Sequence, residues 1–286
     1  MTSAEEQTLA ERLEAGELVV WPTCPFTLPT EQDSTFLRSQ QSPTAISLDP
    51  QSGLLDHPRA ASADDAEQLA AILRNFSRSA SGWLAHQLPE YAGKWTRDRS
   101  SWLSFEEATR PCRHQDRNDL LHIDTSPDRP TNGRRILRLY VNLNQNEPRV
   151  WVMSHPFERV LQLARQRQRV PAMNPREWCL PLAGLQRLLQ RDWSGRPAYD
   201  CFMSRIQQML RSDEQFQEKA PRRLTSFAPG SAWLLFGDAI AHAELRGQFA
   251  LEHTFFVPPH ALARPELSPL EQLVAAGDRN AVRRAA

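Results

Sequence analysis

The sequence predicts an α+β protein whose core is an antiparallel sandwich or jelly roll, with helices packed outside it. Helical segments occupy parts of the first 118 residues, and short β-like runs begin at about residue 119. The runs resume after a helical stretch, and this order suggests strands that close into two packed layers. The expected strands are 120–124, 135–144, 149–153, 224–228, 232–236 and 248–257.

Length and composition are those of one globular domain, 1–286. Hydrophobic residues make up 40% of the chain and charged residues 24%, which is too apolar for a disordered protein. Lys+Arg and Asp+Glu both number 34, so the net charge is zero and we expect no nucleic-acid partner. The four cysteines form no CxxC pair, which argues against a zinc knuckle or a disulfide framework.

The N-terminus and the apolar runs bear on location. The first 16 residues carry acids and no apolar run, unlike a secretory signal. The longest apolar stretches, around 233–236 and 255–259, are far shorter than the roughly 20 residues that a spanning helix needs. We therefore expect a cytoplasmic protein with at most peripheral contact with a membrane.

The N-terminal part, 1–118, is expected to provide flanking helices and loops. Residues 3–15 predict a helix in which Ser3 and Glu6 form a capping box. Gly16 then ends the helix, because glycine readily takes the conformation that terminates one.

A short strand and a second helix follow in the N-terminal part. Residues 18–21 read as a strand, and 25–61, rich in Pro, Ser, Gln and Asp, as a surface loop in which 45–48 is an apolar run. A helix begins at Ser62 and has a stripe of apolar residues at helical spacing.

The strands expected at 119–258 form the jelly-roll core. A helical insertion interrupts this core at about 154–220, and 259–286 forms a C-terminal tail for which the sequence suggests no pattern. The residues that carry chemistry lie on the expected strands.

Three residues form a candidate metal site. His122 and Asp124 lie two residues apart on an expected strand, so both side chains leave the same face. A third ligand, His242, follows a strand that ends at a Gly-Asp turn. Two histidines and one carboxylate make a facial triad, which leaves coordination positions open for a co-substrate and dioxygen.

Other histidines have surroundings that favour different roles. His114 lies in a charged run and His155 precedes a proline at an expected helix start, so we interpret them as solvated or capping residues. His253 shares a strand face with apolar residues and is interpreted as a packed core histidine in preference to a ligand.

Residues 135–144 alternate with period two, and the alternation suggests a site for a carboxylate. Four apolar residues make one face, whereas Arg138 shares the other face with a tyrosine and an asparagine. An arginine fork matches a carboxylate in two places, so Arg138 is the candidate anchor for the distal carboxylate of 2-oxoglutarate. Two alternatives stay open: Arg138 can pair with an acid of the protein, or Arg246 can be the anchor.

Arg149 and Trp151 lie on one face of the next expected strand. Together they can hold a sugar acid, by carboxylate pairing and by contact with the ring. The pattern is equally compatible with a strand at the rim whose polar face lies in water.

Four segments together resemble the Kdo 3-hydroxylases. They are LHIDTSP at 121–127, PTNGRRILR at 130–138, PRVW at 148–151 and GDAIAHAELRGQ at 237–248. The resemblance runs from the strand at residue 19 to about Pro258. It implies a double-stranded β-helix, iron(II), 2-oxoglutarate and dioxygen, and 3-hydroxylation of the outer Kdo sugar of Kdo2-lipid A.

The resemblance also implies site residues. The ligands carry over to His122, Asp124 and His242, and the co-substrate anchor to Arg138. Many 2-oxoglutarate oxygenases place Arg or Lys some ten residues after the distal histidine, whereas this chain has Leu-Glu-His at 251–253, so its anchor must lie elsewhere. Apart from the resemblance, four upstream arginines are alternative contacts for Kdo carboxylates or lipid A phosphates: Arg97, Arg99, Arg110 and Arg113.

A basic segment suggests how a neutral chain meets an anionic glycolipid. Arg159, Arg165, Arg167 and Arg169 follow one another without an intervening acid, beside apolar residues. The segment can rest on the anionic cytoplasmic face of the inner membrane, or it can be a solvated helix face.

Two rival functions remain open from the sequence. One is a 2-oxoglutarate oxygenase that acts on another small acid or lipid. The other is a metal-binding jelly roll that recognises a sugar without catalysis.

Overall fold

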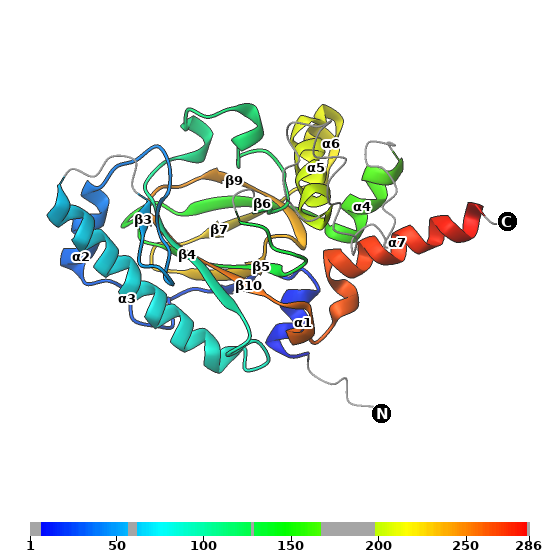
Figure 1. Ribbon diagram of the computed structural model, residues 1–286. Helices are drawn as coiled ribbons and strands as arrows, with labels where there is room; N and C mark the ends of the chain where they lie inside the picture. Colours follow the sequence, from blue (N-terminus) through cyan, green and yellow to red (C-terminus); the bar gives the residue numbers. More distant parts are fainter. Residues whose placement is uncertain (1–6, 57–61, 127–128, 167–197, 285–286) are drawn as a thin grey trace, which may run out of the picture.

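A computed structural model describes residues 7–56, 62–126, 129–166 and 198–284 (Figure 1). The strands are β1 (Val19–Trp21), β2 (Ile46–Leu48), β3 (Leu55–Asp56), β4 (Thr96–Leu103), β5 (Arg135–Asn142), β6 (Arg149–Pro156), β7 (Arg223–Phe227), β8 (Ala232–Phe236), β9 (Ile240–Arg246) and β10 (Ala250–Val257). They form a seven-stranded sheet, in the order β1-β8-β5-β10-β4-β2-β3, and a three-stranded sheet, in the order β7-β6-β9. The neighbouring strands pair antiparallel, as the sequence predicted.

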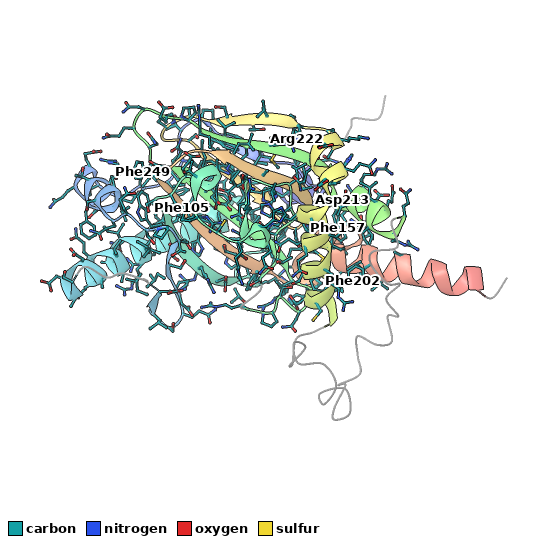
Figure 2. All side chains as sticks on the ribbon, turned by 90° about the horizontal axis from the view of Figure 1, so that it is seen from above. Phe105, Phe157, Phe202, Asp213, Arg222 and Phe249 are labelled. Atoms are coloured by element: carbon teal, nitrogen blue, oxygen red, sulfur yellow. The ribbon has the colours of Figure 1, made fainter. Side chains whose placement is uncertain are left out.

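Helices surround the two sheets. The α-helices are α1 (Leu9–Glu14), α2 (Glu31–Ser39), α3 (Ala63–Gln87), α4 (Phe157–Gln166), α5 (Ala198–Ser212), α6 (Glu214–Lys219) and α7 (Pro269–Arg284). Short 3-10 turns are η1 (Glu107–Thr109), η2 (His114–Asp116), η5 (Pro259–Ala261) and η6 (Pro265–Leu267). Helices α2 and α3 lie at one end of the molecule, and α4 to α7 gather at the other (Figure 1). Phe157 of α4 and Phe202 of α5 belong to one buried cluster at that second end (Figure 2).

Strand β5 shows how the sheets divide the core. Leu137 and Leu139 pack in the cluster that the large sheet shares with α1 and α3. Tyr140, on the opposite face, packs between the sheets with Trp151 and Trp233. The predicted alternation of this strand is confirmed, and the face that carries Arg138 is the one turned toward the second sheet.

The N-terminal part differs from the prediction because it contributes strands as well as helices. Strand β1 confirms the strand expected at 18–21, but β2, β3 and β4 also join the large sheet, although 1–118 was expected to supply mainly helices and loops. Strand β4 was missed because its interior residues are polar. Ser100 donates to the carbonyl of Leu73 at 3.0 Å and Ser101 bonds the hydroxyl of Ser47 at 2.8 Å, so these serines are buried without an apolar pattern.

Two helix predictions in this part also need correction. The loop expected at 25–61 contains α2, whose capping box of Thr30 and Asp33 the sequence reading overlooked. Helix α1 begins at Leu9 with Thr8 as its cap, later than the predicted start, and residues 1–6 lie outside the described residues. The helix predicted from Ser62 is confirmed as α3, and the Ser62 hydroxyl caps it by accepting from the backbone N–H of Asp65.

The later elements follow the prediction in part, because the strand expected at 120–124 is reduced to an isolated bridge at His122 and β9 was not expected as a strand. The described parts of the insertion at about 154–220 are helical apart from its two ends, and β8 has the expected bounds. The tail at 259–286 contains α7, a helix that the sequence did not suggest. Among the described residues, no helix has the length and hydropathy to cross a bilayer.

Candidate metal centre and adjoining cavity

The backbone brings the three predicted ligands together. His122 and His242 form an antiparallel bridge, with reciprocal N–H···O bonds of 2.9 and 2.8 Å. The N–H of Asp124 donates to the carbonyl of Gly237 at 2.8 Å. Backbone hydrogen bonds therefore join the segment of His122 and Asp124 both to Gly237 in the turn and to His242 in β9.

The side chains of His122, Asp124 and His242 converge on one point. Each offers a potential ligand atom, and these atoms lie within 4.8 Å of one another. Nε2 of each histidine is 3.8 Å from Oδ1 of Asp124. All three residues are buried. Such spacing fits three donors on one ion, because ligand bonds of about 2 Å separate neighbouring donors by about 3 Å or more.

Hydrogen bonds orient the two imidazoles. Nδ1 of His122 contacts the carbonyl of Leu120 at 2.8 Å, and Nδ1 of His242 contacts the carbonyl of Ile240 at 3.0 Å. A carbonyl only accepts, so each Nδ1 carries the proton and each Nε2 presents its lone pair to the shared point. Burial, followed by the charge of Arg211, lowers the pKa of His122 and keeps it in the neutral form that binds metals.

Arg138 lies against the carboxylate of the triad. Its Nε is 2.8 Å from Oδ2 of Asp124, but the N–H does not point at the oxygen, so Oδ2 has no aligned hydrogen-bond partner. Its Nη1 bonds Glu252 at 2.5 Å and the hydroxyl of Tyr140 at 3.2 Å. The positive charge of Arg138 thus offsets the negative charge of the buried Oδ2, while no hydrogen bond occupies the lone pairs of this oxygen.

Gly237 leaves the space that the Asp124 carboxylate occupies. A Cβ built on Gly237 would lie 1.7 Å from Oδ2 of Asp124, which excludes any other residue without movement of the carboxylate. The next residue, Asp238, forms a buried ion pair with Arg135, whose Nε lies 3.0 and 3.1 Å from its two oxygens. This pair holds the turn against β5.

A cavity of about 260 Å³ adjoins the triad, since Arg138 both lines it and contacts Asp124. Strands of the large sheet, β9 and the segment around η1 form its walls. Charged side chains are prominent in the lining, and they include Glu107, Arg110, Arg138, Glu244 and Glu252.

The predicted co-substrate anchors lie in different surroundings. Arg138 lines the cavity and pairs with two acids of the protein, which is the alternative that the sequence left open for it. Arg246 is 60% exposed, lies 3.9 Å from Glu147 and does not belong to the cavity lining.

The predicted substrate residues divide in the same way. Arg110 lines the cavity, whereas Arg113 is 77% exposed and pairs with Asp116. Arg149 and Trp151 are buried between the sheets and do not line the cavity. Trp151 stacks on the ring of His242 with centroids 5.5 Å apart, so the structure supports neither a sugar contact nor a solvated rim for this strand face.

The other histidines lie away from the triad. His114 is exposed in η2, and His155 is half-buried beside the ring of Phe216. His253 is buried and bonds the hydroxyl of Ser77 at 2.8 Å, as expected of a core histidine.

Several residues that shape the site were not foreseen. Gly237 was noted only as part of a turn, and Glu107, Glu252 and Arg211 carried no pattern that set them apart. Their importance comes from contacts between distant segments, for which the linear sequence has no signal.

Comparison with known proteins assigns the family. The model of the 3-deoxy-D-manno-oct-2-ulosonic acid (Kdo) hydroxylase family matches residues 1–280. The apo structure of the Kdo hydroxylase KdoO, a non-heme Fe(II) alphaketoglutarate dependent dioxygenase, matches with a TM-score of 0.80 and 29% identity, over 94% of this chain and 88% of that one. Its complex with alphaketoglutarate and Fe(III) gives the same values. Its complex with cobalt(II) gives 0.80 and 28%, over 94% and 89%.

No curated protein sequence matches this chain. The family model nevertheless spans nearly all of it, and the residues expected to bind the metal are those that converge in the structure. The chain belongs to the Kdo hydroxylase family.

Proposed function

We propose that this protein hydroxylates C3 of the outer Kdo sugar of Kdo2-lipid A, with iron(II), 2-oxoglutarate and dioxygen. The observation that carries the proposal is the convergence of two histidine Nε2 atoms and the Asp124 carboxylate beside a cavity that contains arginines. The overall reaction converts substrate, 2-oxoglutarate and dioxygen into hydroxylated substrate, succinate and carbon dioxide.

His122, Asp124 and His242 are proposed to hold the iron. The donor set suits it, because two neutral imidazoles and one carboxylate on one face leave open positions. Bound iron(II) supplies the activation of dioxygen, which the protein's side chains cannot provide. The protein contributes orientation: the carbonyls of Leu120 and Ile240 fix the imidazole rings, and Gly237 leaves room for the carboxylate.

Arg138 is proposed to bind the distal carboxylate of 2-oxoglutarate. It lines the cavity beside the triad, and among the described residues its Nη2 has no hydrogen-bond partner. Nη2 can therefore donate to a further carboxylate while Nη1 keeps its bond to Glu252. Arg246 suits this role less well, because it is exposed and outside the lining.

The finer fold assignment also belongs to this proposal. We infer that the two antiparallel sheets are the double-stranded β-helix of 2-oxoglutarate oxygenases. The inference is supported by the TM-score of 0.80 to KdoO and by the location of the triad between β9 and the segment before β5.

Contact with the cytoplasmic face of the inner membrane is the last part of the proposal. Helix α4 ends in a basic turn with Arg165, and Arg167 and Arg169, which were expected to extend the contact, lie outside the described residues. Sedimentation with anionic vesicles, at several salt concentrations, tests this contact. The parent should bind more than a variant with Gln at all three positions, and equal binding would contradict it.

Mass spectrometry of the lipid tests the activity itself. Incubation of this protein in air with Kdo2-lipid A, iron(II) and 2-oxoglutarate should give lipid with one added oxygen atom, together with succinate. Omission of iron or 2-oxoglutarate should abolish both products. Succinate without modified lipid would point to another substrate, and the absence of both products under complete conditions would contradict an oxygenase.

A further inference from the structure

Arg110 is a further arginine of the cavity lining, besides Arg99 and Arg138, and two hydrogen bonds hold its guanidinium. Nε of Arg110 donates to Oε2 of Glu107 at 3.0 Å, and its Nη2 donates to the carbonyl of Asp116 at 2.7 Å. Its guanidinium lies over the ring of Phe105, 5.1 Å from the centroid. Among the described residues no partner bonds its Nη1, so one edge of a held guanidinium is left for a ligand.

Glu107 is itself held in place. Its Oε1 accepts from the amide of Asn118 at 3.0 Å, and Asn118 in turn accepts from Arg211 at 2.9 Å. Burial, and then the neighbouring Glu244 carboxylate, raises the pKa of Glu107 to about 7. A carboxylate buried beside another carboxylate is unfavourable by itself, and such arrangements gather at functional sites. The arrangement makes sense if Glu107 is there to orient Arg110.

We propose that Arg110 binds the carboxylate of the sugar acid, with Glu107 as its positioning residue and Glu244 as an acceptor for a sugar hydroxyl. This inference rests on the proposed function and assigns separate arginines to the two acids: Arg138 takes 2-oxoglutarate and Arg110 takes the sugar. Glu244 suits its role because one oxygen accepts from Arg149 at 2.6 Å, while the other has no partner among the described residues and the side chain lines the cavity.

The chemistry of the sugar explains why its carboxylate is the group to hold. In an oct-2-ulosonic acid the carboxylate carbon is C1, so C3 lies two bonds away. A residue that clamps C1 therefore restricts C3 more closely than one that holds the far end of the chain, and close restriction of the reacting carbon favours reaction. Arg110 and Arg138 line the same cavity, and only Arg138 contacts the triad directly.

The test measures binding of the free sugar acid and of its methyl ester to protein loaded with cobalt(II) and 2-oxoglutarate. Wild type should prefer the acid by about 10- to 100-fold, as expected for a charge-assisted pair. Arg110→Gln should lose this preference while it binds 2-oxoglutarate normally. Arg110→Lys should keep part of the preference, since it keeps the charge without the fork.

Glu107 requires a readout that a purely structural role would not change. Glu107→Ala should weaken sugar binding and raise the KM for sugar with unchanged KM for 2-oxoglutarate, and Glu107→Asp should restore part of the loss. Arg78→Gln is the control, because Arg78 is exposed on α3 and lies outside the cavity lining. It should behave as wild type in both measurements.

The outcomes separate this inference from the proposed function. Arg110 does not bind the carboxylate if folded Arg110→Gln still prefers the acid over the ester as wild type does. The same conclusion follows if wild type shows no preference. If wild type prefers the acid through Arg110 but forms no hydroxylated product, the binding assignment stands and the proposed activity is wrong.

Discussion

Replacement of Gly237 by alanine should disable the metal centre although no proposed ligand is replaced. The added Cβ would lie 1.7 Å from Oδ2, 2.5 Å from Cγ and 3.0 Å from Cβ of Asp124, whereas ordinary contacts are 3.4–4 Å. The carboxylate must therefore move by roughly 1.5 Å or more, which is most of the length of a metal–oxygen bond of about 2.0–2.2 Å. The backbone of Asp124 cannot follow freely, because it is bonded to the carbonyl of Gly237.

The size of the effect follows from this displacement. Changes that only disturb the support of a ligand reduce metal affinity by about 10- to 100-fold. Displacement of a ligand should exceed that range, so we expect a loss of more than about 100-fold, or about 2.8 kcal/mol. Overpacking of a core costs about 1–3 kcal/mol, so the variant should remain folded at 25 °C.

Calorimetric titration with cobalt(II) measures the loss, and thermal unfolding checks the fold. The matched control is Gly82→Ala in α3, where an added Cβ meets nothing within 4 Å. The control should bind metal as wild type does and be stabilised slightly, because alanine favours a helix by about 1 kcal/mol over glycine. If Gly237→Ala binds cobalt(II) within threefold of wild type, the steric argument is wrong.

Further predictions concern the ligands, the co-substrate and acid stability. Alanine at His122, Asp124 or His242 should abolish cobalt(II) binding and turnover while circular dichroism stays native, and near wild-type turnover would remove that residue from the ligand set. Arg138→Ala should raise the KM for 2-oxoglutarate by about 10- to 150-fold, with partial recovery in Arg138→Lys, and an unchanged KM would argue against this anchor. Burial lowers the pKa of His253 to about 3, so below its unfolded pKa of about 6.5 only the unfolded state takes up its proton. The stability that neutral His253 contributes is complete above that pH, and the free energy of unfolding of the wild type should fall by about 2 kcal/mol at pH 5 for this reason. Urea unfolding at pH 7 and pH 5 measures the fall, and His253→Gln should lack this part of it.

A strand could be predicted where apolar residues on one face alternate with polar residues on the other. In β5 the apolar face and the face that carries Arg138 alternate without exception, and the structure places them on opposite sides of the large sheet. In β4 the buried positions include serines whose hydroxyls are bonded inside the protein, so burial leaves no apolar signature. Helix α2 was missed for another reason: its capping box was present in the sequence, but it is followed by few apolar residues.

The site shows the same division between local and distant information. The spacing of His122 and Asp124 is local, and the chemistry of the pair suggests a metal regardless of the fold. The face shared by Arg149 and Trp151 was also local and correctly read, but what it faces depends on the second sheet. Both side chains are buried, and Trp151 packs against Tyr140 and Trp233 of the large sheet, so this face lies inside the sandwich instead of lining the cavity.

The groups that tune the centre depend on register, which explains why ligand chemistry could be predicted and ligand geometry could not. Gly237 meets Asp124 because its N–H donates to the carbonyl of Ile136 at 3.0 Å, beside the pairing of β5 with β8. A shift of one residue in that pairing would turn Arg138 to the opposite face of the sheet. It would also put a residue with a side chain opposite the carboxylate. The same register therefore determines both the space for the ligand and the charge beside it, and a sequence without its strand pairing cannot reveal either.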